Sequence, residues 1–238
     1  MRWVRLADER QPSNMRPGTG TGCWRWLRYA QSLAITTLCR HDTSMTTHHA
    51  VQIPGKILLF SGHMIDAPGR DKARFPPDKE PAARLAIVAL LAQLDVGSQD
   101  LAISSGACGG DLLFAEAALE RGLALEIYLP FEADVFAVKS VDFAGGDWHA
   151  RFEVACAAGS LHVMPHERGP SAPGDDPYEK NNLWMLEAAS RFGAGKVDFI
   201  CLWDGRGGDG PGGTQHLMQE VSRRHGRTHW IDTTRLWK

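Results

Sequence analysis

The chain has 238 residues, of which 43% are hydrophobic, and this length allows one substantial buried core. The net charge of -2 excludes a general attraction to nucleic acid or to anionic membranes, and no apolar run approaches the ~20 residues that a membrane-spanning helix needs. The five cysteines are widely spaced and never form C-x-x-C, which argues against a disulfide framework and a zinc site and favours a reducing cytoplasm. We therefore expect no metal and no cofactor.

Charge divides the chain into two parts. Residues 1–50 hold seven of the 26 basic residues but only three of the 28 acidic ones, and they show no helical or strand period. We interpret this segment as a basic, disordered leader, with a partner-binding arm as the alternative. Residues 51–238 keep 19 basic and 25 acidic residues, so nucleic acid is a poor partner for this part, which we expect to form the folded domain.

From Lys56 onward, apolar runs of strand length alternate with helical patterns. The pattern predicts buried strands at 56–61, 101–104, 123–129, 161–164, 197–203 and 228–231. It predicts helices at 81–94, 112–119, 149–158, 177–192 and 215–225, the fourth opened by the capping sequence Asp176-Pro177-Tyr178-Glu179. Residues 131–148 are interpreted as a loop or lid with Gly145-Gly146 as its hinge. This alternation indicates a three-layer α/β fold with a doubly wound, mostly parallel sheet and helices on both faces.

Two glycine-rich turns each join a predicted strand to a predicted helix. Glycine lets backbone amides approach a ligand, and the helix N-terminus that follows favours an anionic group. Two such turns predict a binding site at the carboxyl edge of the sheet, where the end of the first strand would also lie. The ligand-binding candidates are Ser61, Gly62 and His63 at that strand end, Ser105, Gly106, Gly109, Gly110 and Asp111 in the first turn, and Gly210, Gly212, Gly213 and Thr214 in the second.

Each candidate also has a structural interpretation. The first glycine turn could be only a tight strand-to-helix connection, and Asp111 could be only a helix cap rather than a contact to a ribose hydroxyl or to an attacking water. Thr214 could bind phosphate or cap the second helix. His63 could contact the ligand or lie on the surface of a loop. We interpret Cys108 as a small wall residue rather than a reactive thiolate.

Three basic residues occupy the proline-containing loop that follows the first strand. Arg70, Lys72 and Arg74 could clamp a phosphate, although a charge run in such a loop is more often simply solvated.

The segment I-S-S-G-A-C-G-G-D-L-L-F-A-E-A-A-L, followed after a short strand by L-P-F, resembles the Rossmann-like SLOG superfamily. That superfamily joins the DNA-processing protein DprA, the YpsA-type proteins and the LOG phosphoribohydrolases. The downstream G-P-G-G-T is similar to the LOG signature P-G-G-x-G-T-x-x-E. The resemblance covers roughly residues 56–231 and implies a nucleotide or nucleotide-derived ligand; it leaves homo-oligomerisation open.

The chain departs from the hydrolase signature at the catalytic glutamate. When the glycines are aligned, Leu217 takes that place, and the nearest carboxylate is Glu220. We therefore expect a sensor or ligand-binding module, with an N-glycosidic hydrolase of nucleoside monophosphates as the alternative. Glycosidic cleavage requires carboxylates for acid/base work, and the candidates for this catalytic role are Asp111, Asp204 and Glu220.

Overall fold

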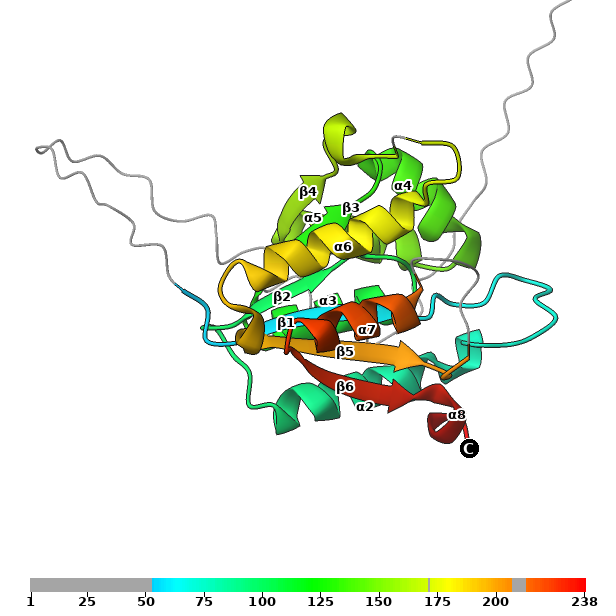
Figure 1. The fold of residues 1–238 in the computed structure, drawn as a ribbon. Coiled ribbons are helices and arrows are strands. Elements are labelled where there is room, and N and C mark those ends of the chain that lie inside the picture. Colours follow the sequence, from blue (N-terminus) through cyan, green and yellow to red (C-terminus); the bar gives the residue numbers. More distant parts are fainter. Residues whose placement is uncertain (1–52, 171, 207–212) are drawn as a thin grey trace, which may run out of the picture. The chain divides into compact units, whose positions relative to one another are not determined.

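A computed structural model of the protein describes residues 53–170, 172–206 and 213–238 (Figure 1). All of these belong to the compact unit of residues 51–238, so the predicted leader of residues 1–50 lies outside the described part. The strands in the described part are β1 (Ile57–Gly62), β2 (Leu101–Ser104), β3 (Ala124–Leu129), β4 (Ser160–Val163), β5 (Val197–Trp203) and β6 (Arg227–Asp232).

These strands form one sheet in the order β4-β3-β2-β1-β5-β6, and every neighbouring pair is parallel. The chain lays down β1 to β4 in one direction and then returns to place β5 and β6 on the other side of β1. The direction of winding therefore reverses between β1 and β5. In open parallel sheets, such a switch point leaves a crevice outside the carboxyl ends of the two strands.

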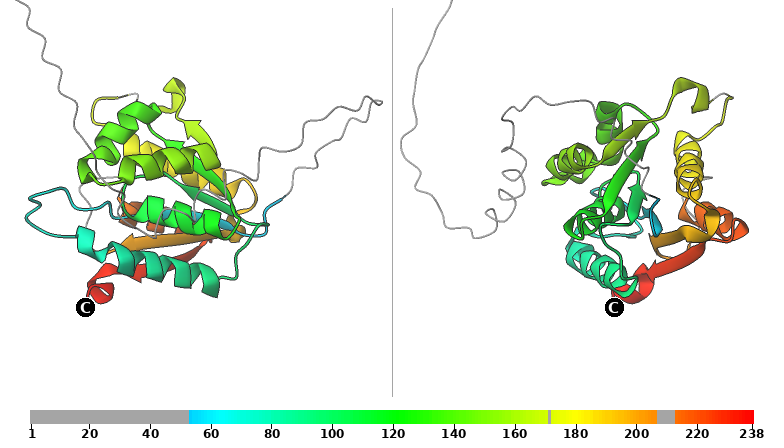
Figure 2. Two further views of the ribbon diagram at one scale, coloured as in Figure 1. Left: turned by 180° about the vertical axis from the view of Figure 1, so that it is seen from behind. Right: turned by 90° about the vertical axis from the view of Figure 1, so that its left-hand side faces the viewer.

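Helices cover both faces of the sheet, as the end-on view in Figure 2 shows. One face carries α2 and α3 with α5, and the other carries α6 and α7. The helices are α2 (Glu80–Gln93), α3 (Gly110–Glu120), α4 (Ala133–Ser140), α5 (Trp148–Ala158), α6 (Pro177–Ser190), α7 (Thr214–Arg223) and α8 (Thr233–Leu236). Short 3-10 turns occur at η1 (Pro77–Lys79), η2 (Asp142–Ala144), η3 (His166–Arg168) and η4 (Ala194–Lys196).

The alternation of side chains along β1 shows why both faces need cover. Ile57 and Leu59 pack into the cluster beneath α6 and α7, while Leu58 and Phe60 pack into the cluster beneath α2 and α3. All four side chains are fully buried. The ring of Phe60 stacks on that of Phe114 from α3 at a centroid distance of 4.8 Å. A continuous apolar strand is therefore the sequence that a sheet covered on both faces requires.

The structure confirms the three-layer, doubly wound α/β fold and places the strands and helices within a few residues of the predicted ranges. Asp176 caps α6 as predicted, because its carboxylate accepts a hydrogen bond from the amide of Tyr178 at 2.8 Å. The interpretation of residues 131–148 as a loop is wrong, since α4 and η2 occupy much of it. Buried Phe136 and Ala137 hold α4 in place, and Gly145 and Gly146, which follow η2, both have positive φ.

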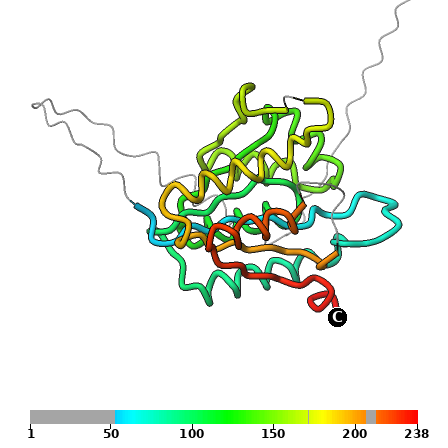
Figure 3. Tube along the Cα trace, in the orientation of Figure 1, coloured from blue at the N-terminus to red at the C-terminus, as the bar shows by residue number. Residues whose placement is uncertain are grey.

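None of the described helices is long and apolar enough to span a bilayer. The segment between β1 and α2, drawn in cyan in Figure 3, extends outward from the carboxyl edge of the sheet. That segment, the first glycine turn and the start of α7 therefore share one edge of the sheet.

Candidate functional site

The end of β1 lies between the first glycine turn and the start of α7. On one side, the hydroxyl groups of Ser61 and Thr214 are 3.3 Å apart, within hydrogen-bonding distance. On the other side, the amide of Gly110 donates to the carbonyl of His63 at 3.0 Å. The structure therefore brings Ser61–His63, the first turn and the start of α7 together at the switch point. Gly210 and Gly212 lie outside the described residues.

The backbone amides of the first turn are largely engaged within the protein. The amide of Gly106 donates to Ser104 Oγ at 3.2 Å, and that of Ala107 donates to Asp111 Oδ2 at 3.3 Å. The amides of Cys108 and Gly110 donate to carbonyls of α4 and of the β1 end, at 2.9 and 3.0 Å. These four groups already have acceptors, so in this conformation they do not present a row of donors to an anion.

Gly109 shows why the first turn needs glycine. Its φ is +94°, and a Cβ atom there would lie 2.7 Å from the amide nitrogen of Ile65 and 2.9 Å from the carbonyl oxygen of His63. The turn is packed against the chain that leaves β1, and Gly106–Asp111 are all buried. Ser105 alone in this stretch, from Ser104 to Asp111, is partly exposed. Close approach of two backbone segments is sufficient reason for glycine at this position.

Asp111 does not cap α3, which corrects that interpretation. The capping residue is Gly109, and Asp111 lies inside the first turn of the helix. Its side chain reaches back, where Oδ2 accepts hydrogen bonds from the hydroxyl of Ser105 and the amide of Ala107. Asp111 is only 5% exposed, and its Oδ1 has no hydrogen-bond partner within the described residues.

Burial raises the pKa of Asp111 to about 6. The hydrogen bonds from Ser105 and Ala107, together with the nearby amide of Gly62, oppose the rise without cancelling it. Desolvation of the charged form is therefore the dominant cause. A carboxyl group with this pKa can hold or release a proton near neutral pH, which is a property of acid/base groups in active sites.

His63 and Asp204 join β1 to β5 across the switch point. His63 Nε2 lies 3.4 Å from Asp204 Oδ1 and accepts a hydrogen bond from the Asp204 amide at 3.1 Å. Burial lowers the pKa of His63, Asp204 opposes this effect, and the positive charge of Arg74 adds to it. The imidazole is therefore neutral near pH 7, with its proton on Nδ1 because Nε2 is the acceptor.

Thr214 and Glu220 both belong to α7, but of these two described residues only Thr214 lies within hydrogen-bonding distance of the end of β1. Gly213 caps the helix without a side-chain hydrogen bond, so the interpretation of Thr214 as a cap is wrong and its hydroxyl faces Ser61 instead. Glu220 pairs with Arg223 and with His216 (3.8 Å) on its own helix. No contact among the described residues joins Glu220 to Asp111 or Asp204, so its catalytic role stays a prediction without geometric support.

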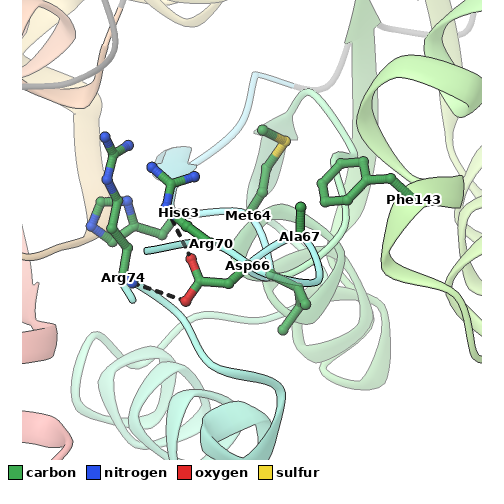
Figure 4. Close-up of a pocket in the computed structure, with 8 residues that line it drawn as sticks. His63, Met64, Asp66, Ala67, Arg70, Arg74 and Phe143 are labelled. Carbon is green, nitrogen blue, oxygen red and sulfur yellow. Dashed lines mark hydrogen bonds and ion pairs between the residues drawn. The ribbon is translucent and has the colours of Figure 1, made fainter. Parts of the chain in front are cut away.

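A half-open pocket of about 250 Å³ lies beside His63, in the loop that follows β1 (Figure 4). Its lining includes Arg70 and Arg74, but not Lys72, which is exposed in the same loop. The three cations were treated as one group in the sequence and were not included among the ligand-binding candidates. Their spacing contained no signal that would separate Lys72 from the two arginines, because the direction of a loop side chain depends on the fold of the loop.

Cys108 is fully buried, which agrees with its interpretation as an unreactive residue. Burial raises the pKa of its thiol to about 12, so the thiol stays protonated at physiological pH. Among the residues that the structure describes, no group of three or more histidine, cysteine, aspartate or glutamate side chains is arranged to hold a metal ion.

No protein-family model and no curated protein matches the chain. Among solved structures, it is similar to DprA from Streptococcus pneumoniae, with 14% identity, coverage of 75% of this chain and 50% of that one, and a TM-score of 0.36. It thus spans about half the length of that protein. It is also similar to the structural-genomics target TM1055, with 16% identity, coverage of 74% of this chain and 92% of that one, and a TM-score of 0.34. A third similar structure is DprA from Helicobacter pylori, described for its single-stranded DNA binding mode, with 13% identity, coverage of 77% of this chain and 79% of that one, and a TM-score of 0.28. Identities and TM-scores this low carry no argument about a ligand, which has to be inferred from the site itself.

Proposed function

We propose that residues 51–238 bind a nucleotide or nucleotide-derived small ligand at the carboxyl edge of the sheet, as a sensor or ligand-binding module. The observation that carries this proposal is the set of polar groups at the switch point between β1 and β5. The hydroxyls of Ser61 and Thr214 face each other at the end of β1, and two residues further on the neutral imidazole of His63 lies 3.4 Å from the carboxylate of Asp204. Hydroxyl, imidazole and carboxylate groups suit the hydroxyls of a sugar. The SLOG resemblance of the sequence points to the same ligand class.

The test measures the melting temperature of the full chain with AMP, GMP, CMP and UMP, and with the matching nucleosides. A ligand at 100 times its dissociation constant adds about 2.7 kcal/mol to the free energy of unfolding, which gives a clear rise in melting temperature. Asp204→Asn should reduce that rise, while Asp134→Asn, an exposed aspartate on α4, should leave it unchanged. The proposal is overturned if no monophosphate stabilises the protein, or if the two variants respond alike.

A single-stranded oligonucleotide belongs in the same panel, because DprA from Helicobacter pylori is described as binding single-stranded DNA. The excess of acidic over basic residues in 51–238 argues against this partner. We expect the oligonucleotide to give a smaller shift than the monophosphates. A larger shift, lost as salt is raised, would replace the small ligand with DNA.

The second candidate is hydrolysis of the N-glycosidic bond of a nucleoside monophosphate, and the buried carboxyl of Asp111 favours it. A pKa of about 6 is close to what an acid/base group needs near neutral pH, and Oδ1 of Asp111 accepts no hydrogen bond among the residues that the structure describes. Incubation with the four monophosphates, followed by chromatography for free base, tests this activity. Release of base by the wild type that Asp111→Asn abolishes would support an enzyme; binding without release would support the sensor.

A further inference from the structure

The pocket beside His63 has two chemically different walls. Figure 4 shows the guanidinium groups of Arg70 and Arg74 on the side of His63, while Met64, Ala67 and Phe143 form the opposite side. The carboxylate of Asp66 also lines the pocket, so one side (the cationic wall) carries two guanidinium groups and one carboxylate, while the other (the apolar wall) is apolar with an aromatic ring. A nucleotide has the matching division between an anionic phosphate and a flat, apolar base.

Hydrogen bonds to the backbone fix the position of Arg74 in the cationic wall. The carboxylate of Asp66 accepts hydrogen bonds from the backbone amides of Arg74 and Phe75, at 2.9 and 3.0 Å. The carbonyl of Arg74 accepts a further bond from the indole of Trp237 at 3.1 Å, and the buried ring of Phe75 stacks on that indole. The backbone of Arg74 is thus fixed on both sides, which lowers the entropy that binding has to remove.

Arg70 approaches the same carboxylate. Its Nε lies 3.5 Å from Asp66 Oδ1 and donates to the carbonyl of Lys72 at 3.1 Å. Asp66 therefore holds the loop together and brings two guanidinium groups to one pocket. Arginine presents a planar fork of donors that matches phosphate oxygens.

The apolar wall comes from two distant segments. Phe143 belongs to η2, and Met64 follows β1 with 44% of its surface exposed. An exposed methionine beside an aromatic ring is an adaptable apolar surface, and aromatic side chains stack on bases with little preference among them. A pocket of about 250 Å³ falls below the roughly 300–1,000 Å³ of sites that enclose a drug-sized ligand, so part of a nucleotide would stay outside it.

We infer that this pocket is the phosphate and base subsite of the ligand: Arg70 and Arg74 hold the phosphate, and Phe143 with Met64 stacks against the base. The inference rests on the proposed function and states how the ligand is oriented in the site. It also assigns the anion to side chains of the loop after β1, because four amides of the first glycine turn donate within the protein. His63 lines the pocket and its Nε2 accepts a hydrogen bond from the Asp204 amide, so it connects this subsite to the switch point.

Calorimetric titration of the full chain with the four nucleoside monophosphates, the matching nucleosides and ribose 5-phosphate tests the assignment. Arg70→Gln and Arg74→Gln should each weaken the monophosphates and ribose 5-phosphate by about tenfold or more, and leave the nucleosides unchanged. Lys72→Gln is the matched control, because this exposed cation is in the same loop and does not line the pocket; it should change affinity by less than about twofold.

Phe143→Ala tests the apolar wall. It should weaken the monophosphates and nucleosides by about tenfold and leave ribose 5-phosphate unchanged, because only the base loses its stacking partner. Val138→Ala is its control, as Val138 is exposed on α4, outside the pocket lining. Melting temperatures of all variants establish that they are folded. Arg74→Lys, which keeps the charge and loses the fork, should give an intermediate loss.

The outcomes separate the two proposals. If monophosphates bind the wild type but Arg70→Gln and Arg74→Gln behave like Lys72→Gln, the subsite assignment is overturned while the proposed function stands. If no monophosphate binds the wild type, the proposed function fails and the assignment fails with it. Selective loss of phosphate-bearing ligands in the arginine variants supports both.

Discussion

The first glycine turn and the loop after β1 meet at the same edge of the sheet but offer opposite surfaces. Gly106–Asp111 are buried, and four amides there donate to acceptors within the protein. The loop from His63 to Arg74 is mostly exposed and carries two arginines around an open pocket. A glycine-rich turn can thus exist to let two backbones pack, while a neighbouring loop without a glycine motif supplies the charge that an anionic ligand needs.

Gly109→Ala tests the packing role and should have the largest effect. The substitution puts a Cβ atom 2.7 Å from the Ile65 amide nitrogen at a φ of +94°, so the strain and the clash add up to a loss of about 3 to 5 kcal/mol in the free energy of unfolding. Gly145→Ala is the control, since its φ is +67° but nothing lies within 4 Å of its Cβ; about 1 kcal/mol is expected. Equal losses in urea unfolding would contradict the packing role.

The buried carboxyl of Asp111 should make stability depend on pH. Its folded-state pKa of about 6 exceeds the ordinary 3.8, so the folded protein binds this proton more tightly than the unfolded chain. The free energy of unfolding should therefore rise as pH falls through about 6, with a total gain of about 3 kcal/mol completed below about 3.8. Asp111→Asn removes this contribution. The free energy of unfolding is measured at several pH values between 4 and 7. If it changes with pH equally for wild type and variant, the carboxyl does not titrate in this way.

Asp66→Ala tests whether the loop depends on one carboxylate. The change leaves the amides of Arg74 and Phe75 without their acceptor, which should lower the free energy of unfolding by about 2 kcal/mol. Asp71→Ala, at an exposed position of the same loop, should change it by less than about 0.5 kcal/mol. Thermal unfolding of both variants makes the comparison, and indistinguishable midpoints would mean that the loop is held by other contacts.

Ser61→Ala is expected to have the smallest effect on stability. It removes one hydroxyl of the partly buried pair with Thr214, which contributes about 0.5 to 1 kcal/mol. Ser98→Ala, an exposed serine far along the chain, should be neutral. A loss above about 2 kcal/mol in chemical denaturation would show that the contact of β1 with the start of α7 is more important for folding than one hydrogen bond.

The strand and helix pattern was predictable because it depends on local properties of the chain. The apolar run of β5 was assigned to the residues Val197–Trp203 that form it, and the start of α6 followed from the Asp176 cap. Burial on both faces produces a continuous apolar run, and capping needs residues only a few positions apart, so both leave a mark in the sequence. The α/β alternation therefore determined the fold class, and α4 was missed because its eight residues lack a clear apolar period.

What each candidate residue contacts was decided by the tertiary structure alone. The sequence could propose Gly109 as a ligand contact, but the strand end that fills the space beside it lies more than forty positions earlier in the chain. In the same way, only the folded loop directs Arg70 and Arg74 to the pocket and leaves Lys72 outside its lining. Periodicity reports which face of an element is buried; it holds no information on which distant backbone group meets a given amide, because that depends on how the strands are ordered and how the loops between them close.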